Sequence, residues 1–170
     1  MKNKTVCFIK LILILLFFLP NSNAQESFNF DVTEIEILDQ GNKFIGKKNG
    51  VAKTENGVVI KANYFEYDKA NNILVALGDV EITDEVREIK IYSEKITYFK
   101  NEELILTTGN SKAINNEGDI ITADDFEYDQ IQDILKAKGN VKVEDKNQNY
   151  QIFSNNLTYY KSKELIFSRG

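Results

Sequence analysis

The chain has 170 residues and a formal net charge of −5, and it contains no histidine, one cysteine and one proline. Without histidine it lacks the commonest general base and the commonest transition-metal ligand, and a single cysteine cannot form a disulfide framework. Its acidic balance disfavours nucleic acid as a partner, because phosphate binding needs a basic surface.

The first 24 residues have the order of a secretory signal peptide. Lysines flank an almost wholly apolar run over residues 6–19, and Pro20 is followed by a small residue, a spacer and a small residue at 22–24. The run is too short for a comfortable membrane span, and Cys7 stands at its front rather than at a lipoprotein cleavage point. We expect cleavage after residue 24 and one exported domain over residues 25–170. An uncleaved anchor is the alternative.

Residues 32–38 (VTEIEIL) follow the signal and alternate Ile35 and Ile37 with acidic side chains. This alternation predicts a strand. The segment also begins a faint copy of the repeat that fills the rest of the chain.

Four clearer copies of the repeat follow, and each has a landmark glycine. Gly78, Gly109, Gly139 and Gly170 are 31, 30 and 31 residues apart. Each copy also keeps an isoleucine, then a small residue, a large apolar residue and a tyrosine at fixed spacing. These columns are Ile60, Ile91, Ile121 and Ile152; Ala62, Ser93, Ala123 and Ser154; Phe65, Ile96, Phe126 and Leu157; and Tyr67, Tyr98, Tyr128 and Tyr159. Such self-similarity is the signature of a repeat architecture.

Hydrophobic residues alternate with a period of two inside each copy. Residues 74, 76, 80 and 82 are apolar, and residues 135–143 repeat the pattern with lysines on the opposite face. The pattern predicts strands with one buried and one solvated face, separated by polar turns such as DKANN and KNEE. The glycine in mid-strand predicts a bulge or bend where the sheet curves.

In the first of the four clearer copies, the apolar residues change from even to odd positions partway along the strand, and this change needs a bend of its own. Ile60 and Ala62 have opposite parity to Phe65 and Tyr67, so a flat strand could not bury all four on one side. We therefore expect a corner or bulge near Asn63.

Two groups of side chains could suggest chemistry. Asp124, Asp125 and Asp129 could be drawn as an acid pair or a calcium cluster, but neither spacing is recognisable, and we interpret them as solvent-facing turn residues. The tyrosine column could stack on sugar rings or close the core, and we favour the core. We predict no catalytic residue, no metal site and no cofactor.

The repeat resembles a known family. Its form A-D-x-F-x-Y-D-x(5)-L-x-A-x-G-N-V, seen best from Ala123 onward, is similar to the OstA-like domain of the Gram-negative lipopolysaccharide (LPS) transport machinery. That domain forms the periplasmic protein LptA and the N-terminal part of the outer-membrane protein LptD. The copy from Ala62 has Asp79 where the family favours asparagine, and the copy from Ser93 has Thr107 and Ser111 in place of alanine and valine. The resemblance covers residues 34–170.

The resemblance implies an all-β fold, an open β-jellyroll of two curved antiparallel sheets with a groove for the acyl chains of lipid A. It also implies LPS transport across the periplasm to the outer membrane, with partner jellyroll modules joined at edge strands and an outer-membrane barrel if the chain is LptD-like. From the alternation we predict that one continuous apolar groove is lined by Ile60, Phe65, Leu74, Ala76, Val80, Ile82, Ile91, Ile96, Ile121, Phe126, Leu135, Ala137, Val141, Val143, Ile152 and Leu157.

Alternatives remain at this stage. Gly170 falls in mid-repeat, so we expect a fragment of something longer and favour an LptD-like N-terminal domain over an LptA-like protein. A secreted β-repeat adhesin without a ligand is one rival. A β-helix polysaccharide lyase is a weaker one, because polar turns between paired strands favour antiparallel hairpins.

Overall fold

The structure, a computed structural model, describes residues 28–147 and 150–169. The expected signal peptide and Gly170 lie outside these residues. Within residues 28–147 and 150–169, twelve strands form one antiparallel sheet. They are β1 (Asn29–Leu38), β2 (Lys43–Lys53), β3 (Val58–Asp68), β4 (Ile73–Asp84), β5 (Ile89–Phe99), β6 (Leu104–Thr108), β7 (Ser111–Asn115), β8 (Ile120–Ala123), β9 (Asp125–Asp129), β10 (Ile134–Glu144), β11 (Gln151–Tyr160) and β12 (Leu165–Arg169).

The only helices in the described part of the chain are the short 3₁₀ turns η1 (Asp39–Gly41) and η2 (Lys161–Lys163). No helix there is long and apolar enough to cross a membrane. The all-β prediction, including a strand over residues 32–38, is confirmed.

The sheet folds into two arms along a line of bends. The pairing register shifts in mid-strand in β1, β2, β3, β4 and β10. The strand pairs β6–β7 and β8–β9 are the two halves of similar long strands, interrupted at residues 109–110 and 124. Arm A comprises residues 34–38, 43–47, 64–68, 73–77, 95–99, 104–108, 125–129, 134–138, 156–160 and 165–169. Arm B comprises residues 29–32, 50–53, 58–62, 80–84, 89–93, 111–115, 120–123, 141–144 and 151–154.

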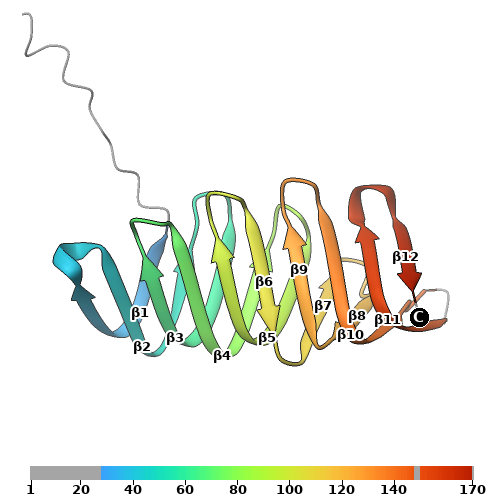
Figure 1. The fold of residues 1–170 in the computed structure, drawn as a ribbon, viewed down its shortest axis with the longest axis horizontal. Coiled ribbons are helices and arrows are strands. Elements are labelled where there is room, and N and C mark those ends of the chain that lie inside the picture. The colour runs from blue at the N-terminus through green and yellow to red at the C-terminus, as the bar shows by residue number, and fades with distance from the viewer. Residues whose placement is uncertain (1–27, 148–149, 170) are drawn as a thin grey trace, which may run out of the picture.

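The two arms give the molecule the form of an elongated trough. Over most of the length, Figure 1 shows strands running from turns along the top of the ribbon to bends along its lower side. The resemblance implies two stacked sheets, but the structure has one continuous sheet, because each long strand passes through a bend and contributes to both arms.

The bends in β4, in β10 and between β6 and β7 are each built from a glycine and the residue after it. Gly139 has φ +77° and Asn140 has φ +48°, and the equivalent pairs at 78–79 and 109–110 have the same sign of φ. Two successive left-handed residues turn the strand, and glycine adopts this region without a Cβ penalty. The Asn140 amide donates to both carboxylate oxygens of Asp124 at 3.0 Å, which fastens neighbouring strands at the bend. The predicted mid-strand bend is confirmed.

The parity change predicted near Asn63 is also confirmed. The register between β3 and β4 shifts between Lys61 and Tyr64. As a result Ile60, on arm B, and Phe65, on arm A, are both fully buried.

We expect Gly139→Ala to lower the free energy of unfolding by about 1–3 kcal/mol, because alanine at φ +77° is strained. Its Cβ would also lie 2.1 Å from Asp124 Oδ2. Urea unfolding measures the loss. Gly41→Ala is the matched control for the steric clash. Gly41 also has a positive φ, +95°, but no atom lies within 4 Å of the point that its Cβ would occupy. Equal stability of Gly139→Ala and the unaltered protein would refute this explanation of the bend.

Candidate binding trough

The sheet register lines up inward side chains as two continuous rows. On arm B the row is Phe30, Ala52, Ile60, Ile82, Ile91, Ala113, Ile121, Val143 and Ile152. On arm A the row nearest the rim is Ile37, Phe44, Tyr67, Leu74, Tyr98, Ile105, Tyr128, Leu135, Tyr159 and Ile166. Directly paired residues share a face, so each row is an apolar stripe along the trough.

Every residue predicted for the groove faces the inside of the trough. All belong to one buried cluster except Ile152, which is partly buried and packs against it. The predicted face of each strand is therefore the inner one. That these side chains bind lipid stays a prediction.

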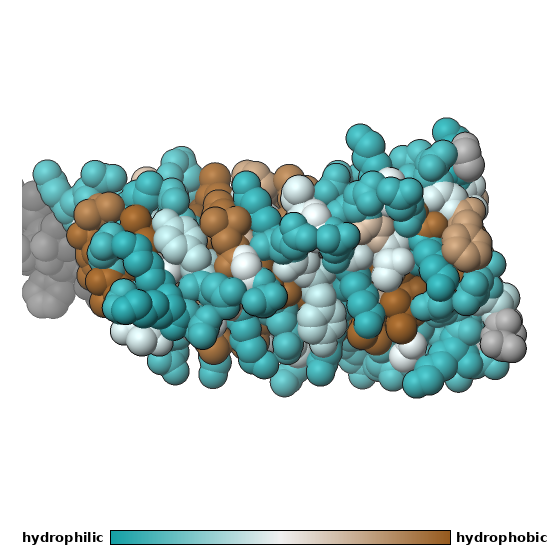
Figure 2. All heavy atoms as spheres, turned by 90° about the horizontal axis from the view of Figure 1, so that it is seen from below, coloured by the Kyte–Doolittle hydropathy of each residue, from teal (hydrophilic) through white to brown (hydrophobic). Residues whose placement is uncertain are grey.

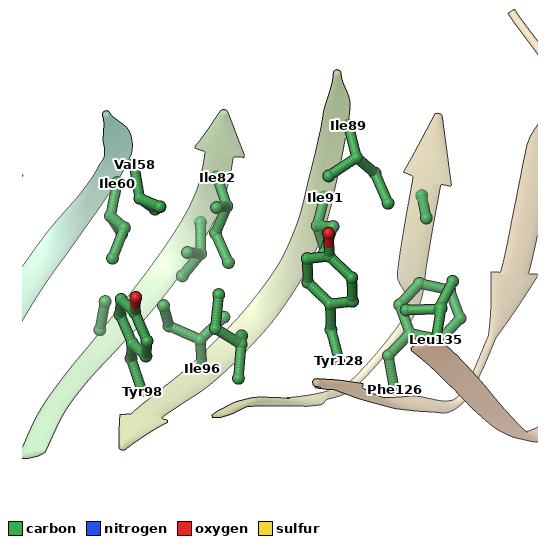
Figure 3. Close-up of a cluster of buried hydrophobic side chains, with 14 of the residues drawn as sticks. Val58, Ile60, Ile82, Ile89, Ile91, Ile96, Tyr98, Phe126, Tyr128 and Leu135 are labelled. Atoms are coloured by element: carbon green, nitrogen blue, oxygen red, sulfur yellow. The ribbon is translucent and has the colours of Figure 1, made fainter. Parts of the chain in front are cut away.

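The middle of the trough is packed rather than hollow. Figure 3 shows side chains of arm B, including Ile60 and Ile91, in one row above a second row from arm A, including Ile96 and Phe126. All four are at most 3% exposed. The expected continuous open furrow is thus absent here, because large side chains on both arms meet and fill the space between them.

The C-terminal section of the trough is open. A cavity of about 340 Å³ lies there, within the size range of small-ligand sites. Its apolar lining consists of Ile89, Ala113, Ile121, Leu135, Val143 and Ile166. Polar and mostly acidic residues also line it, among them Glu88, Asp119, Asp145 and Glu164, with Lys161 as a basic member. Polar groups make up more of the cavity wall than apolar ones, so the cavity combines an apolar patch with a larger polar surface.

The tyrosine column closes the core along arm A, as predicted. Tyr98 and Tyr128 are at most 1% exposed, and their hydroxyls donate to Gln130 Oε1 at 2.7 Å and Asp133 Oδ1 at 3.1 Å. Burial raises the pKa of both phenols, and nearby carboxylates raise it further. Tyr159 is less buried and lines the cavity, so the last tyrosine of the column has a different environment from the others.

Sequence reasoning missed a polar cluster that joins the two arms across the mouth of the middle section. We call it the Arg87 cluster, and it comprises Asn56, Asp84, Arg87, Glu103 and Gln130. Asn56, Asp84 and Arg87 belong to arm B or its turns, whereas Glu103 and Gln130 belong to turns of arm A. The sequence did contain a clue to this cluster, since the chain has only two arginines and one of them, Arg87, lies in a turn between two strands.

Sequence reasoning also missed Phe28. This residue precedes β1 and is 2% exposed. Its ring meets those of Tyr67 and Tyr98 edge-on, with centroids 5.1 and 5.7 Å apart. An aromatic side chain from the N-terminal end of β1 therefore adds to the packing of the middle section.

The described residues contain no group of three or more histidine, cysteine, aspartate or glutamate side chains placed to hold a metal ion. The aspartates considered in the sequence have local roles instead. Asp124 fastens a bend, and Asp129 accepts hydrogen bonds from Gln132 in the next turn.

We expect the protein to lose stability as the pH rises above about 10, the pKa of an unperturbed tyrosine. The pKa values of Tyr98 and Tyr128 are raised in the folded state. The contribution of these two phenols to the free energy of unfolding is therefore complete below the pKa of tyrosine in the unfolded chain, and it is lost as the pH rises through the pKa of the folded state. Phenolate absorbance and circular dichroism should change together. Tyr98→Phe should move this transition to higher pH, and phenolate formation at pH 10 by every tyrosine of the folded protein would contradict the assignment.

Comparison with known proteins gives a matching family and a solved structure with a similar fold. Residues 59–165 match the family described as "LptA/(LptD N-terminal domain) LPS transport protein". No curated protein matches the chain. Among solved structures, the fold is similar to that of LptH, the LptA-homologous periplasmic component of the lipopolysaccharide transport device from Pseudomonas aeruginosa, with a TM-score of 0.59 and 16% identity. That similarity covers 68% of this chain and 84% of the other.

The family match spans more than half of the chain and falls on the repeats that form the two-armed trough. The chain therefore belongs to the LptA and LptD N-terminal domain family of LPS transport proteins.

Proposed function

We propose that this protein carries LPS through the periplasm by sheltering the acyl chains of lipid A in its trough. The observation that carries the proposal is the pair of apolar rows, which run the length of the sheet and open into a cavity at the C-terminal section. A twelve-carbon chain left in water costs on the order of 10 kcal/mol, at about 0.8 kcal/mol per CH₂. A carrier must remove that cost, and it needs no bond-making chemistry, so we propose a transport role and no enzymatic one.

We further propose that acyl chains bind first in the open section. Ile121, Leu135 and Val143 come from the predicted groove and line this cavity. Ile89 and Ile166 extend the same apolar surface. The acidic residues at the mouth leave the phosphates of lipid A outside, where water can solvate them.

The two ends of the sheet support a role as one module of a bridge. Among the described strands, β1 and β12 each pair with a single neighbour, so each has one unpaired edge. Ile35 and Ile37 of β1 lie on the inner face but are 55% and 64% exposed. Figure 2 shows a largely hydrophilic face interrupted by hydrophobic patches, one of which lies at the N-terminal end. A second jellyroll paired to an edge would extend the sheet and cover such side chains.

The proposed setting is the periplasm, reached by cleavage of a signal peptide over residues 1–24, with residues 25–170 as the jellyroll domain. The proposed partners are LPS and other jellyroll modules. If the chain is the N-terminal domain of an LptD-like protein, an outer-membrane barrel is a further partner.

We expect Ile121→Arg to abolish binding of a fluorescent LPS probe, because it places a charge in the apolar lining of the cavity. Ile166→Arg changes the one partly buried residue of the otherwise exposed edge strand β12, and it is a second variant that the fold tolerates more easily. Lys142→Met, on the outer face of β10, is the control and should bind normally. Unchanged probe binding by folded Ile121→Arg and Ile166→Arg would refute the site, and no binding by the unaltered protein would favour the ligand-free adhesin.

Edge pairing has its own test. We expect the protein to associate at high concentration in sedimentation experiments, and we expect Ile37→Lys to weaken the association severalfold by charging the uncovered end of the arm A row. Glu85→Lys, in an exposed turn away from both edges, is the control. Equal association by both variants would exclude β1 as a pairing edge.

A further inference from the structure

The Arg87 cluster ties the turns of one arm to the turns of the other over the packed middle section. Arg87 Nη2 lies 3.1 Å from Glu103 Oε2, and Arg87 Nε donates to the backbone oxygen of Gln130 at 2.9 Å. The Asn56 amide donates to Glu103 Oε1 at 3.0 Å. Turns of the two rims are thereby joined to one another.

The cluster reaches into the trough through Asp84. This carboxylate is 1% exposed and accepts hydrogen bonds from Arg87 Nη1 at 3.1 Å and Gln130 Nε2 at 2.8 Å. Gln130 is itself 2% exposed and accepts the hydroxyl of Tyr98. A buried carboxylate needs such partners, because leaving one unpaired in an apolar interior is strongly unfavourable.

The cluster lies over the section of the trough that is packed, whereas the open cavity begins beyond it. Ile60, Ile91 and Ile96 fill the interior in this middle section. An acyl chain that moved from the open cavity toward β1 along the apolar rows would have to separate the arms there. Separation would break the bonds of Arg87 to both Glu103 and Gln130.

We propose that the Arg87 cluster is a latch: it holds the middle of the trough shut, confines acyl chains to the C-terminal section, and must open before a chain can occupy the full length. This inference rests on the proposed transport function. It assigns Arg87, Asp84, Glu103 and Gln130 as residues that set where along the trough the lipid lies. The latch is reversible because its bonds are polar and lie at the rim, where water can replace them once the arms part.

The test measures the distance between the arms directly. Spin labels are placed on cysteines at Glu85 and Glu102, two exposed turn residues of arm B and arm A beside the latch, in the domain of residues 25–170, whose sequence has no other cysteine. A second pair at Glu117 and Lys163 reports on the open section. The variant is Asp84→Asn with Arg87→Met, which removes both charges together and so leaves no buried carboxylate unpaired. Lys136→Met, which breaks the 2.6 Å pair with Glu127 within arm A, is the matched control.

We expect the latch variant to lengthen and broaden the 85–102 distance distribution while the 117–163 distribution stays unchanged. We also expect purified LPS to bind about tenfold more tightly to the latch variant. In the unaltered protein, part of the binding free energy is used to separate the arms, and the variant no longer has this cost. In the unaltered protein, LPS at saturation should widen the 85–102 distribution as well. The control should behave as the unaltered protein does.

The outcomes separate the two proposals. If LPS binds and alters the 117–163 pair, but the latch variant changes neither the 85–102 distances nor the affinity, the latch is refuted and the transport function stands. If LPS does not bind any form, the transport function fails. The latch proposal is overturned in that case too, because it has no lipid to confine. Thermal unfolding of each labelled form checks that it keeps its fold. A longer distance in a folded form then means that the arms have parted.

Discussion

The structure depends on cross-strand register that is maintained through a bend. Each long strand bends where its pairing register shifts and resumes its pairing in the other arm, and in β4 and β10 the bend is a glycine followed by a second left-handed residue. Because the bend adds residues without losing register on either side, apolar positions from neighbouring strands meet as rows on both arms. A single flat sheet would present one apolar face to water. The folded sheet instead turns both halves of that face toward each other.

The same rows produce two different interiors. In the middle section, isoleucine, phenylalanine and tyrosine side chains of the two arms form one buried cluster, and the Arg87 cluster joins the rims above it. Where the arms stand apart near β10, β11 and β12, the same kind of side chain lines an open cavity. Lipid shelter and fold stability thus depend on the same apolar surface, so acyl chains and side chains compete for the same space. This competition explains why polar groups at the rim, rather than the apolar rows themselves, are suited to control access.

Much of this architecture was predictable from the sequence. The spacing of Gly78, Gly109 and Gly139 indicated the bends, and the parity change between Ile60 and Phe65 located one of them to within two residues. The inner face of each strand followed from period-two alternation. The packed middle section was not predictable, because alternation states which side chains share a face but not how closely two faces approach. The Arg87 cluster depends on contacts between turns up to 47 residues apart, and no local pattern encodes those contacts.

The central claim is that acyl chains lie against the inner face of the trough. The most direct measurement is nuclear Overhauser contact between LPS acyl-chain protons and isoleucine methyl groups of the labelled protein. Ile121 lines the cavity, and its neighbour Ile120 points from the same strand toward the outer face. The account predicts contacts to Ile121 and Ile166 and none to Ile120. Contacts to Ile120 with none to Ile121 would contradict it.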